Sequence, residues 1–295
     1  MSSSNSISFN GRQYKKAEIM SEMVSLAKQL ASNAHLLADS PLPADTDLSE
    51  SEQTEVQNQI AAMLILPPDA LIIFWDAFAA NHLNDIAVSL RRLSHTTQPH
   101  AVSTAIQILS LIPEPAEQDR HPYFRKFLRN STAVKDVPNI VADAFVKGMT
   151  LKKPSGPGRH CTLIINTLFW CDTSLGDDGR ASVDAGIRAA LANAIQATLD
   201  HPRSAELDRM QRVEMERLKG ILLTINMEEL GPGGYFLKST REHLEGRFDM
   251  CSGNDCDEDA ELSCSKCKTV RYCGAECQSW HWKHGHRARC FQTDY

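Results

Sequence analysis

The chain has 295 residues, of which 42% are hydrophobic and 23% are charged, and its formal net charge is −6. This composition is typical of a globular protein with one or two domains, and it excludes a disordered polyelectrolyte or a fibre. The negative net charge argues against a protein held on nucleic acid by its overall electrostatic field.

Membrane attachment and secretion are also not expected. The longest apolar stretch runs from Ile60 to Trp75, is interrupted by two prolines and an aspartate, and is too short to span a bilayer. The N-terminal residues MSSSNSISFNGRQYKK lack the apolar core of a secretory signal. We therefore expect an intracellular protein, in the nucleus or the cytoplasm, whose cysteines are reduced.

The N-terminal part of the chain contains one helical pattern between two polar segments. Residues 1–12 are rich in Ser and Asn and are expected to be disordered. Apolar residues then recur at steps of three or four over residues 14–37, which predicts a helix with one buried face. The acidic, Pro- and Ser-rich residues 38–53 are expected to form a loop or linker.

Helical patterns continue to about residue 247. The segment ALIIFWDAFAA after Asp69 is apolar on nearly all sides, so we expect it to lie in the core. Pro138 fits the first turn of a later helix, and two long stripes follow over residues 183–199 and 207–225. Strand signals are scarce. The expected fold class for residues 13–247 is mainly α, a helical array built as an armadillo-like solenoid or an irregular bundle.

A cluster of cysteines follows the helical region, with seven of the nine cysteines between Cys251 and Cys290. With one histidine they form four closely spaced pairs, and each pair can reach one metal from a tight knuckle or one helix turn. Eight ligands satisfy two tetrahedral Zn²⁺ ions with no position left for water, which predicts structural sites. The alternative is a disulfide knot, which a reducing compartment disfavours. The candidate ligands are Cys251, Cys256, Cys264, Cys267, Cys273, Cys277, His286 and Cys290.

The segment RYCGAECQSWHWKHGH and the pair spacing resemble the MYND-type zinc finger over about residues 251–290. In that family the first and third pairs bind one zinc ion, and the second and fourth pairs bind the other. The resemblance therefore implies a cross-braced finger with one all-cysteine site and one site of three cysteines and a histidine. The first implied set is Cys251, Cys256, Cys273 and Cys277, and the second is Cys264, Cys267, His286 and Cys290.

The chain departs from the family pattern in two places. The first pair has the spacing Cys-x4-Cys instead of Cys-x2-Cys, so we expect a looser knuckle. Gly285 occupies the position where the family often has its histidine, while His286 keeps the usual His-x3-Cys step. His281 and His284 lie nearby, and we favour His286 over His284 as the ligand. A cross-braced RING finger would need a Cys-x-His step and a closing Cys-x2-Cys, which are absent.

MYND fingers are known as protein-interaction modules, often for short proline-containing peptides. The resemblance implies that Ser265, Gln278 and Trp282 line a peptide groove, in which the flat indole is a platform for proline rings. Thr269 lies in the segment with the strongest strand signal of the finger, whose edge is expected to pair with an extended peptide. The alternative for Trp282 is packing against the zinc-binding helix.

The expected function is that of a non-enzymatic adaptor, in which residues 248–295 form a zinc finger that captures a proline-containing peptide. A segment of this size buries too little apolar surface to fold without its metal. Phosphate-loop, dinucleotide, nucleophile-elbow and zinc-protease motifs are absent. Two alternatives remain. One is a lysine methyltransferase-related or other enzyme that the finger recruits, and the other is a nucleic-acid-associated transcription cofactor, although direct nucleic-acid binding is not expected.

Overall fold

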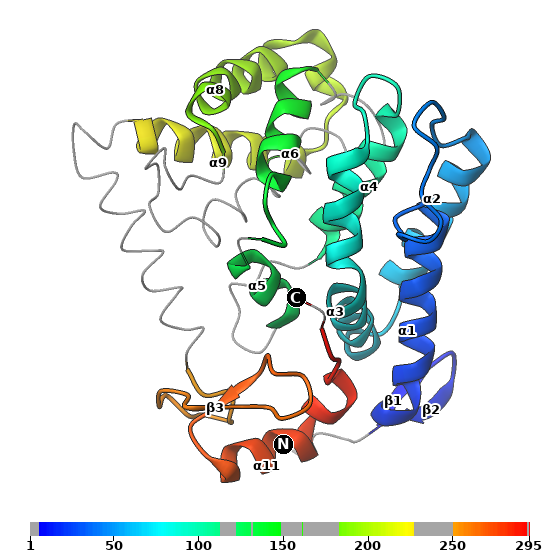
Figure 1. Cartoon of the computed structure of the whole chain (residues 1–295), viewed down its shortest axis with the longest axis vertical. Helices are drawn as coiled ribbons and strands as arrows, with labels where there is room; N and C mark the ends of the chain where they lie inside the picture. Colours follow the sequence, from blue (N-terminus) through cyan, green and yellow to red (C-terminus); the bar gives the residue numbers. More distant parts are fainter. Residues whose placement is uncertain are drawn as a thin grey trace.

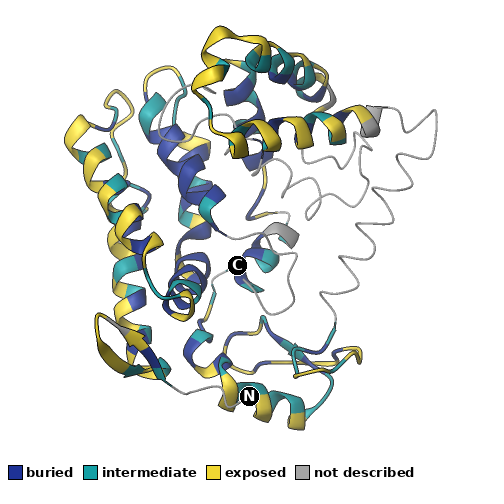
Figure 2. Ribbon diagram, turned by 180° about the vertical axis from the view of Figure 1, so that it is seen from behind, coloured by how far each residue is buried: buried dark blue, intermediate teal, exposed yellow. Residues whose placement is uncertain are grey.

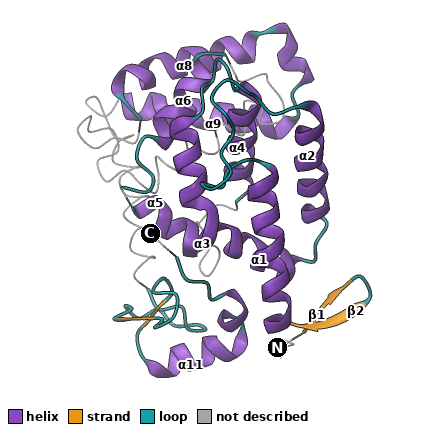
Figure 3. Cartoon of the chain, turned by 45° about the vertical axis from the view of Figure 1, so that its right-hand side comes forward, coloured by secondary structure: helices purple, strands orange, loops and turns teal. Residues whose placement is uncertain are grey.

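The computed structural model describes residues 6–112, 122–130, 132–148, 161, 183–226, 250–293 and 295. These residues are mainly helical with two small sheets, which confirms the predicted fold class (Figure 3). No helix in the described part of the chain is long and apolar enough to cross a membrane. The expected boundary between the helical region and the finger, at residues 247 and 248, lies outside the described residues.

The N-terminal residues from Ser6 onward form a hairpin, although residues 1–12 were expected to be disordered, and residues 1–5 lie outside the described residues. The strands β1 (Ser6–Phe9) and β2 (Arg12–Lys15) pair antiparallel. The turn residues Asn10 and Gly11 both have positive φ, which is the geometry that an Asn-Gly pair favours in a two-residue hairpin. Ile7 is buried against the helices and anchors the hairpin.

The first helices follow the predicted patterns closely. The helix α1 (Lys16–Asn33) buries the predicted stripe, and α2 (Glu50–Leu64) begins within the expected loop. It begins there because Ser49 and Glu52 form a capping box: the Ser49 hydroxyl accepts from the Glu52 N–H, and the Glu52 carboxylate accepts from the Ser49 N–H. The expected loop therefore ends at Ser49.

The helix α3 (Pro68–Arg92) is the centre of the packing. It contains the predicted apolar segment after Asp69 and continues beyond it to Arg92, and most of its residues up to Leu90 are buried. It contacts α1, α4 (Pro99–Leu111), α5 (Pro122–Arg129) and α6 (Val137–Val146). Buried residues gather where these helices meet, and exposed residues lie on their outer faces (Figure 2).

A second group of helices lies at the opposite end of the molecule from the finger (Figure 1). There α6, in which Pro138 occupies the first turn as predicted, packs against α8 (Ala185–Asp200), and α8 packs against α9 (Arg209–Asn226). The short 3-10 helix η2 (Pro202–Glu206) connects the last two. The contacts of α3 with four helices describe packing around one buried helix and do not by themselves define a solenoid. The armadillo-like arrangement therefore stays a prediction.

The finger lies below the helical region, beside the N-terminal end of α1 (Figure 1). It contains β3 (Leu262–Ser263), β4 (Arg271–Tyr272), α11 (Ala275–His284) and the 3-10 helix η5 (His286–Arg289). The strands β3 and β4 pair antiparallel, with Leu262 opposite Tyr272. The helix η5 contacts both α1 and α3, so the finger packs directly against the helical region.

Candidate metal centre

The first cluster joins a knuckle at residues 251–256 to the start of α11. The knuckle is closed by an isolated bridge between Met250 and Asp259 and by a hydrogen bond from the Cys251 N–H to the Glu258 carbonyl. The four sulfur atoms of the cluster all lie within 4.8 Å of one another. The cluster consists of Cys251, Cys256, Cys273 and Cys277.

The second cluster joins the turn after β3 to η5, and it is entirely buried. The turn is closed by a hydrogen bond from the Lys268 N–H to the Cys264 carbonyl, and Lys268 has a positive φ of 55°. Its ligand atoms also lie within 4.8 Å of one another. The cluster consists of Cys264, Cys267, His286 and Cys290, so both groupings follow the interleaved pairing of the resemblance.

The spacing of the donor atoms fits tetrahedral zinc. With Zn–S of about 2.3 Å and Zn–N of about 2.0–2.1 Å, ideal geometry places two sulfurs about 3.8 Å apart and a sulfur and a nitrogen about 3.6 Å apart. The Sγ atoms of Cys256 and Cys273 are 3.6 Å apart, and those of Cys264 and Cys290 are 3.8 Å apart. The Sγ atom of Cys267 lies 3.6 Å from Nε2 of His286. The two clusters can therefore bind two zinc ions.

The crowded thiols of each cluster compete for protons. Hydrogen bonding from Cys290 lowers the pKa of Cys267 to about 3, and the same contact raises the pKa of Cys290. In the first cluster, hydrogen bonding with Cys251 raises the pKa of Cys273 to about 12. One thiolate in each set is thus stabilised at the expense of its neighbours. Bound zinc removes this conflict, because its charge favours the thiolate form of all of them.

The three histidines of the finger have different surroundings. His286 is buried in the second cluster, whereas His284 is exposed, and its Nδ1 lies 2.6 Å from the Trp280 carbonyl oxygen. His281 is half-buried, and its Nδ1 lies 3.1 Å from the Tyr272 hydroxyl. Burial lowers the pKa of His281 to about 3, so it is neutral and packs its ring against that of His286. The geometry therefore groups His286, and not its neighbours, with the cysteines.

The four residues proposed for the peptide groove are found in different surroundings. Ser265 is exposed, Gln278 is half-buried, and the Thr269 hydroxyl donates to the Cys267 carbonyl at 2.9 Å. Trp282 is half-buried, and its ring meets the His286 ring edge-on, with 5.9 Å between the ring centroids. Trp282 also lines a cavity against α1, in whose lining Ser265, Thr269 and Gln278 take no part.

The edge of β4, where an extended peptide was expected to pair, is occupied at one position. The Arg271 carbonyl accepts a hydrogen bond from the Ser252 N–H at 2.9 Å, so the first knuckle covers the strand there. Strand addition at Arg271 would have to break this bond.

Contacts between the finger and the helical region were not anticipated from the sequence. The Tyr123 hydroxyl donates to the Arg289 carbonyl at 2.6 Å and accepts from the Phe291 N–H at 2.7 Å. The Arg289 side chain pairs with Asp76, which is fully buried in α3. The Tyr295 hydroxyl donates to a carbonyl of the same helix. The aromatic residues Phe291 and Tyr295, which follow the last cysteine, are a sequence signal that could have indicated buried contacts there.

Comparison with known proteins supports the finger, and each relative named below matches at most 20% of the chain. Residues 250–290 match the MYND finger family. Ubiquitin carboxyl-terminal hydrolase 19 of Arabidopsis thaliana is 38% identical over 60 residues, which is 20% of this chain and 9% of that protein. Ubiquitin carboxyl-terminal hydrolase 17 of the same plant is 53% identical over 32 residues, 11% of this chain and 4% of that protein. Ubiquitin C-terminal hydrolase 15 of Oryza sativa subsp. japonica is 49% identical over 37 residues, 12% of this chain and 4% of that protein.

The chain spans less than a tenth of the length of these curated relatives. No solved structure matches it significantly. Because the matched residues belong to a non-catalytic module, they show no enzymatic domain in this chain. The matched segment contains both cysteine and histidine clusters, and MYND fingers mediate protein–protein interactions. The chain thus carries a MYND-type zinc finger, a protein-interaction module, over residues 250–290.

Proposed function

We propose that the protein is a non-enzymatic intracellular adaptor whose finger, residues 248–295, captures a proline-containing peptide of a partner protein. In this proposal the eight clustered residues bind two structural zinc ions. Every ligand position is then occupied by a protein side chain, so no open position is left for catalysis. The thiols need a reducing compartment to stay available for zinc, which favours the nucleus or the cytoplasm.

The position of Trp282 is the observation that carries this proposal. Its ring packs against that of His286 in a T-shaped arrangement, so the second metal site positions the indole. The side chain is only half-buried and also faces a cavity. A flat, rigid aromatic surface held in this way suits a proline ring, which loses little conformational freedom on binding. Gln278, one turn earlier on α11, and Ser265 and Thr269, in the turn that follows β3, are the further groove residues of the proposal.

The likeness to ubiquitin carboxyl-terminal hydrolases supports a role of the finger in binding a partner protein, and it does not support a hydrolase activity of this chain. The identity covers at most 20% of this chain, and the hydrolase names describe proteins more than ten times as long as the matched part. We therefore propose that the helical region is a scaffold and that the finger brings a partner to it. Methyl transfer from S-adenosylmethionine to a protein substrate by the purified chain would contradict this assignment.

The test uses the full-length, zinc-saturated chain labelled with ¹⁵N at the tryptophan indoles. It is titrated with a library of proline-containing peptides and with the same library carrying Ala for Pro. We expect the Trp282 indole signal to shift with the first library alone, while the signal of Trp75, which lies in the core, stays in place.

Trp282→Ala assigns the signal and is expected to abolish binding. Trp280→Ala is the matched control, because Trp280 is 40% exposed and stacks on His284. Binding that survives Trp282→Ala, or that does not distinguish Pro from Ala, would overturn the proposal.

A further inference from the structure

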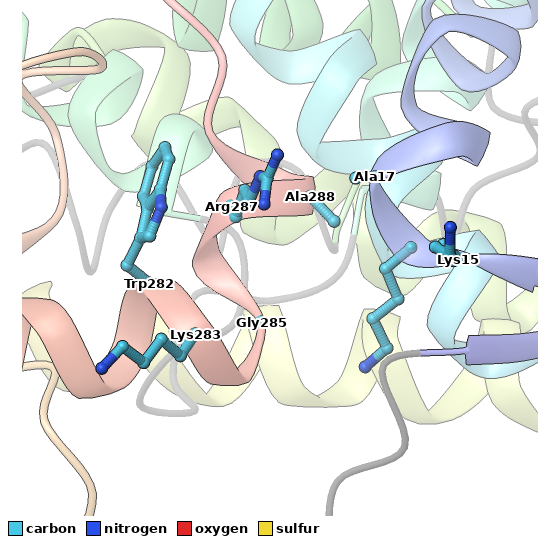
Figure 4. Close-up of a pocket in the computed structure, with 8 residues that line it drawn as sticks. Lys15, Ala17, Trp282, Lys283, Gly285, Arg287 and Ala288 are labelled. Atoms are coloured by element: carbon cyan, nitrogen blue, oxygen red, sulfur yellow. The ribbon is translucent and has the colours of Figure 1, made fainter.

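A cavity of about 210 Å³ lies where the finger meets the helical region. Figure 4 shows it between α11 and η5 on one side and the start of α1 on the other. Trp282 forms an aromatic wall, and Ala17, Gly285 and Ala288 are the small residues of its lining. The volume is below the range of about 300–1,000 Å³ found for small-molecule and cofactor sites, so the cavity suits one or two side chains of a peptide.

The charged residues of this cavity are all basic. Lys15 and Lys16 line it from the helical region, and Lys283 and Arg287 line it from the finger. The chain as a whole has a net charge of −6, so the positive charge of this cluster is opposite in sign to that of the whole chain. We call these four residues the basic junction.

Part of the charge of the basic junction is balanced within the chain. Lys15 pairs with Glu18 at 3.3 Å, and Lys16 pairs with Asp69 at 3.3 Å. The Lys15 pair is highly exposed and therefore contributes little. Within the described residues, Lys283 and Arg287 make no ion pair. At least two positive charges beside Trp282 are thus available for a ligand.

We propose that the basic junction binds an acidic residue that flanks the proline of the captured peptide. The inference rests on the proposed capture of a proline-containing peptide and adds a specificity to it. A proline ring against Trp282 brings the neighbouring residues of an extended peptide to the cations, because consecutive residues are about 3.3 Å apart along a strand. A Glu or Asp side chain then gains ion pairs with Arg287 and the lysines.

The helical region supplies half of this site. Two of the four cations precede or begin α1, so the isolated finger would lack them. A peptide is favoured over nucleic acid because the cavity is small and the chain as a whole has a net charge of −6. Binding of a single-stranded oligonucleotide in place of the peptides would overturn the inference.

The experiment measures the affinity of the full-length, zinc-saturated chain for two matched peptide libraries. Each library has a fixed central proline, and its flanking positions carry Glu in one library and Gln in the other. We expect the Glu library to bind more tightly. Lys15→Gln in the helical region and Arg287→Gln in the finger are each expected to weaken Glu-library binding by roughly two- to fivefold, the effect of a partly exposed ion pair.

Binding of the Gln library is expected to be unchanged in both variants. Lys28→Gln is the matched control, because Lys28 is exposed on the same helix about 18 Å along its axis from Lys16. The preference for Glu should also shrink when NaCl is raised from about 50 mM to about 500 mM, since salt screens exposed charges.

The outcomes separate the two proposals. If neither library binds, the capture of proline-containing peptides fails and the acidic preference fails with it. If both libraries bind equally and the variants have no effect, the peptide capture stands and the basic junction is only a solvated surface. If the Glu preference persists undiminished in the Lys15→Gln and Arg287→Gln double variant, the carboxylates bind elsewhere and the inference is wrong.

Discussion

At the scale of single residues, Gly253 explains how the long first knuckle closes on α11. Its N–H points at the Cys251 sulfur, 3.3 Å away. A Cβ atom at this position would lie 2.7 Å from the Sγ and 2.8 Å from the Cβ of Cys277, which is closer than real Cβ atoms approach. The close approach of the knuckle to the helix therefore requires glycine.

This contact predicts that Gly253→Ser damages the all-cysteine site. The added side chain must push Cys277 or the knuckle out of position, and the expected loss of zinc affinity is at least about tenfold at that site, the size seen when the surroundings of a ligand are disturbed. Competition with a chromogenic chelator should then remove one of the two zinc ions early.

Gly274→Ser is the matched control, because a Cβ at Gly274 meets nothing within 4 Å and serine is a good residue at the start of a helix. Equal zinc retention by the two variants would show that the knuckle tolerates a side chain.

At the scale of elements, local sequence signals predict the helices well. The stripes over α1, α2 and α3 mark buried faces because helix burial repeats every three to four residues. The β1–β2 hairpin was missed because its Ser- and Asn-rich residues resemble a disordered tail, although the Asn10–Gly11 pair is a hairpin signal. The start of α2 was placed late because the acidic residues of its first turn resemble a linker.

The capping box at α2 predicts a pH dependence. Hydrogen bonds from the Ser49 side chain and backbone, followed by one from His35 at 2.9 Å, lower the pKa of Glu52 from 4.5 to about 2. A carboxylate with a lowered pKa in the folded state stabilises it above pH 4.5, and this contribution is lost as the pH falls toward 2.

We expect Glu52→Gln to reduce the free energy of unfolding by at most about 1 kcal/mol near pH 7, because the side chain is 40% exposed and solvent screens its interactions. The difference from the wild type should shrink between pH 4.5 and pH 2. Urea unfolding followed by far-UV circular dichroism measures it, with Glu50→Gln in the same turn as the control. Zinc release in acid affects all three proteins alike, so a difference that is constant with pH would contradict the assignment.

At the scale of the whole molecule, the sequence predicts the eight clustered residues but not the docking of the finger on the helices. Closely spaced cysteine pairs predict a metal site from the sequence alone, because the members of each pair are neighbours in the chain. Asp76 and Arg289 are 213 positions apart, and nothing near either residue identifies its partner. The basic junction has the same origin, since α1 and η5 meet only in the folded molecule.

The buried pair also predicts an asymmetry between its two members. Arg289→Met removes the cation that pairs with the fully buried Asp76, and the loss of one member of a buried pair costs about 3–5 kcal/mol in comparable sites. Asp76→Asn leaves Arg289, whose side chain is 19% exposed, in contact with solvent and should cost less. The double variant Asp76→Asn, Arg289→Met should be more stable than Arg289→Met alone, because the charge of Asp76 is removed together with that of Arg289.

Thermal unfolding of the four zinc-saturated proteins measures this cycle, and limited proteolysis reports whether the finger has left the helices. Arg287→Met is the matched control, since Arg287 is exposed two residues away and its removal should hardly change stability. If the double variant is no more stable than Arg289→Met alone, the ion pair does not hold the finger in place. The hydrogen bonds of Tyr123 to Arg289 and Phe291 would then be the contacts that dock it.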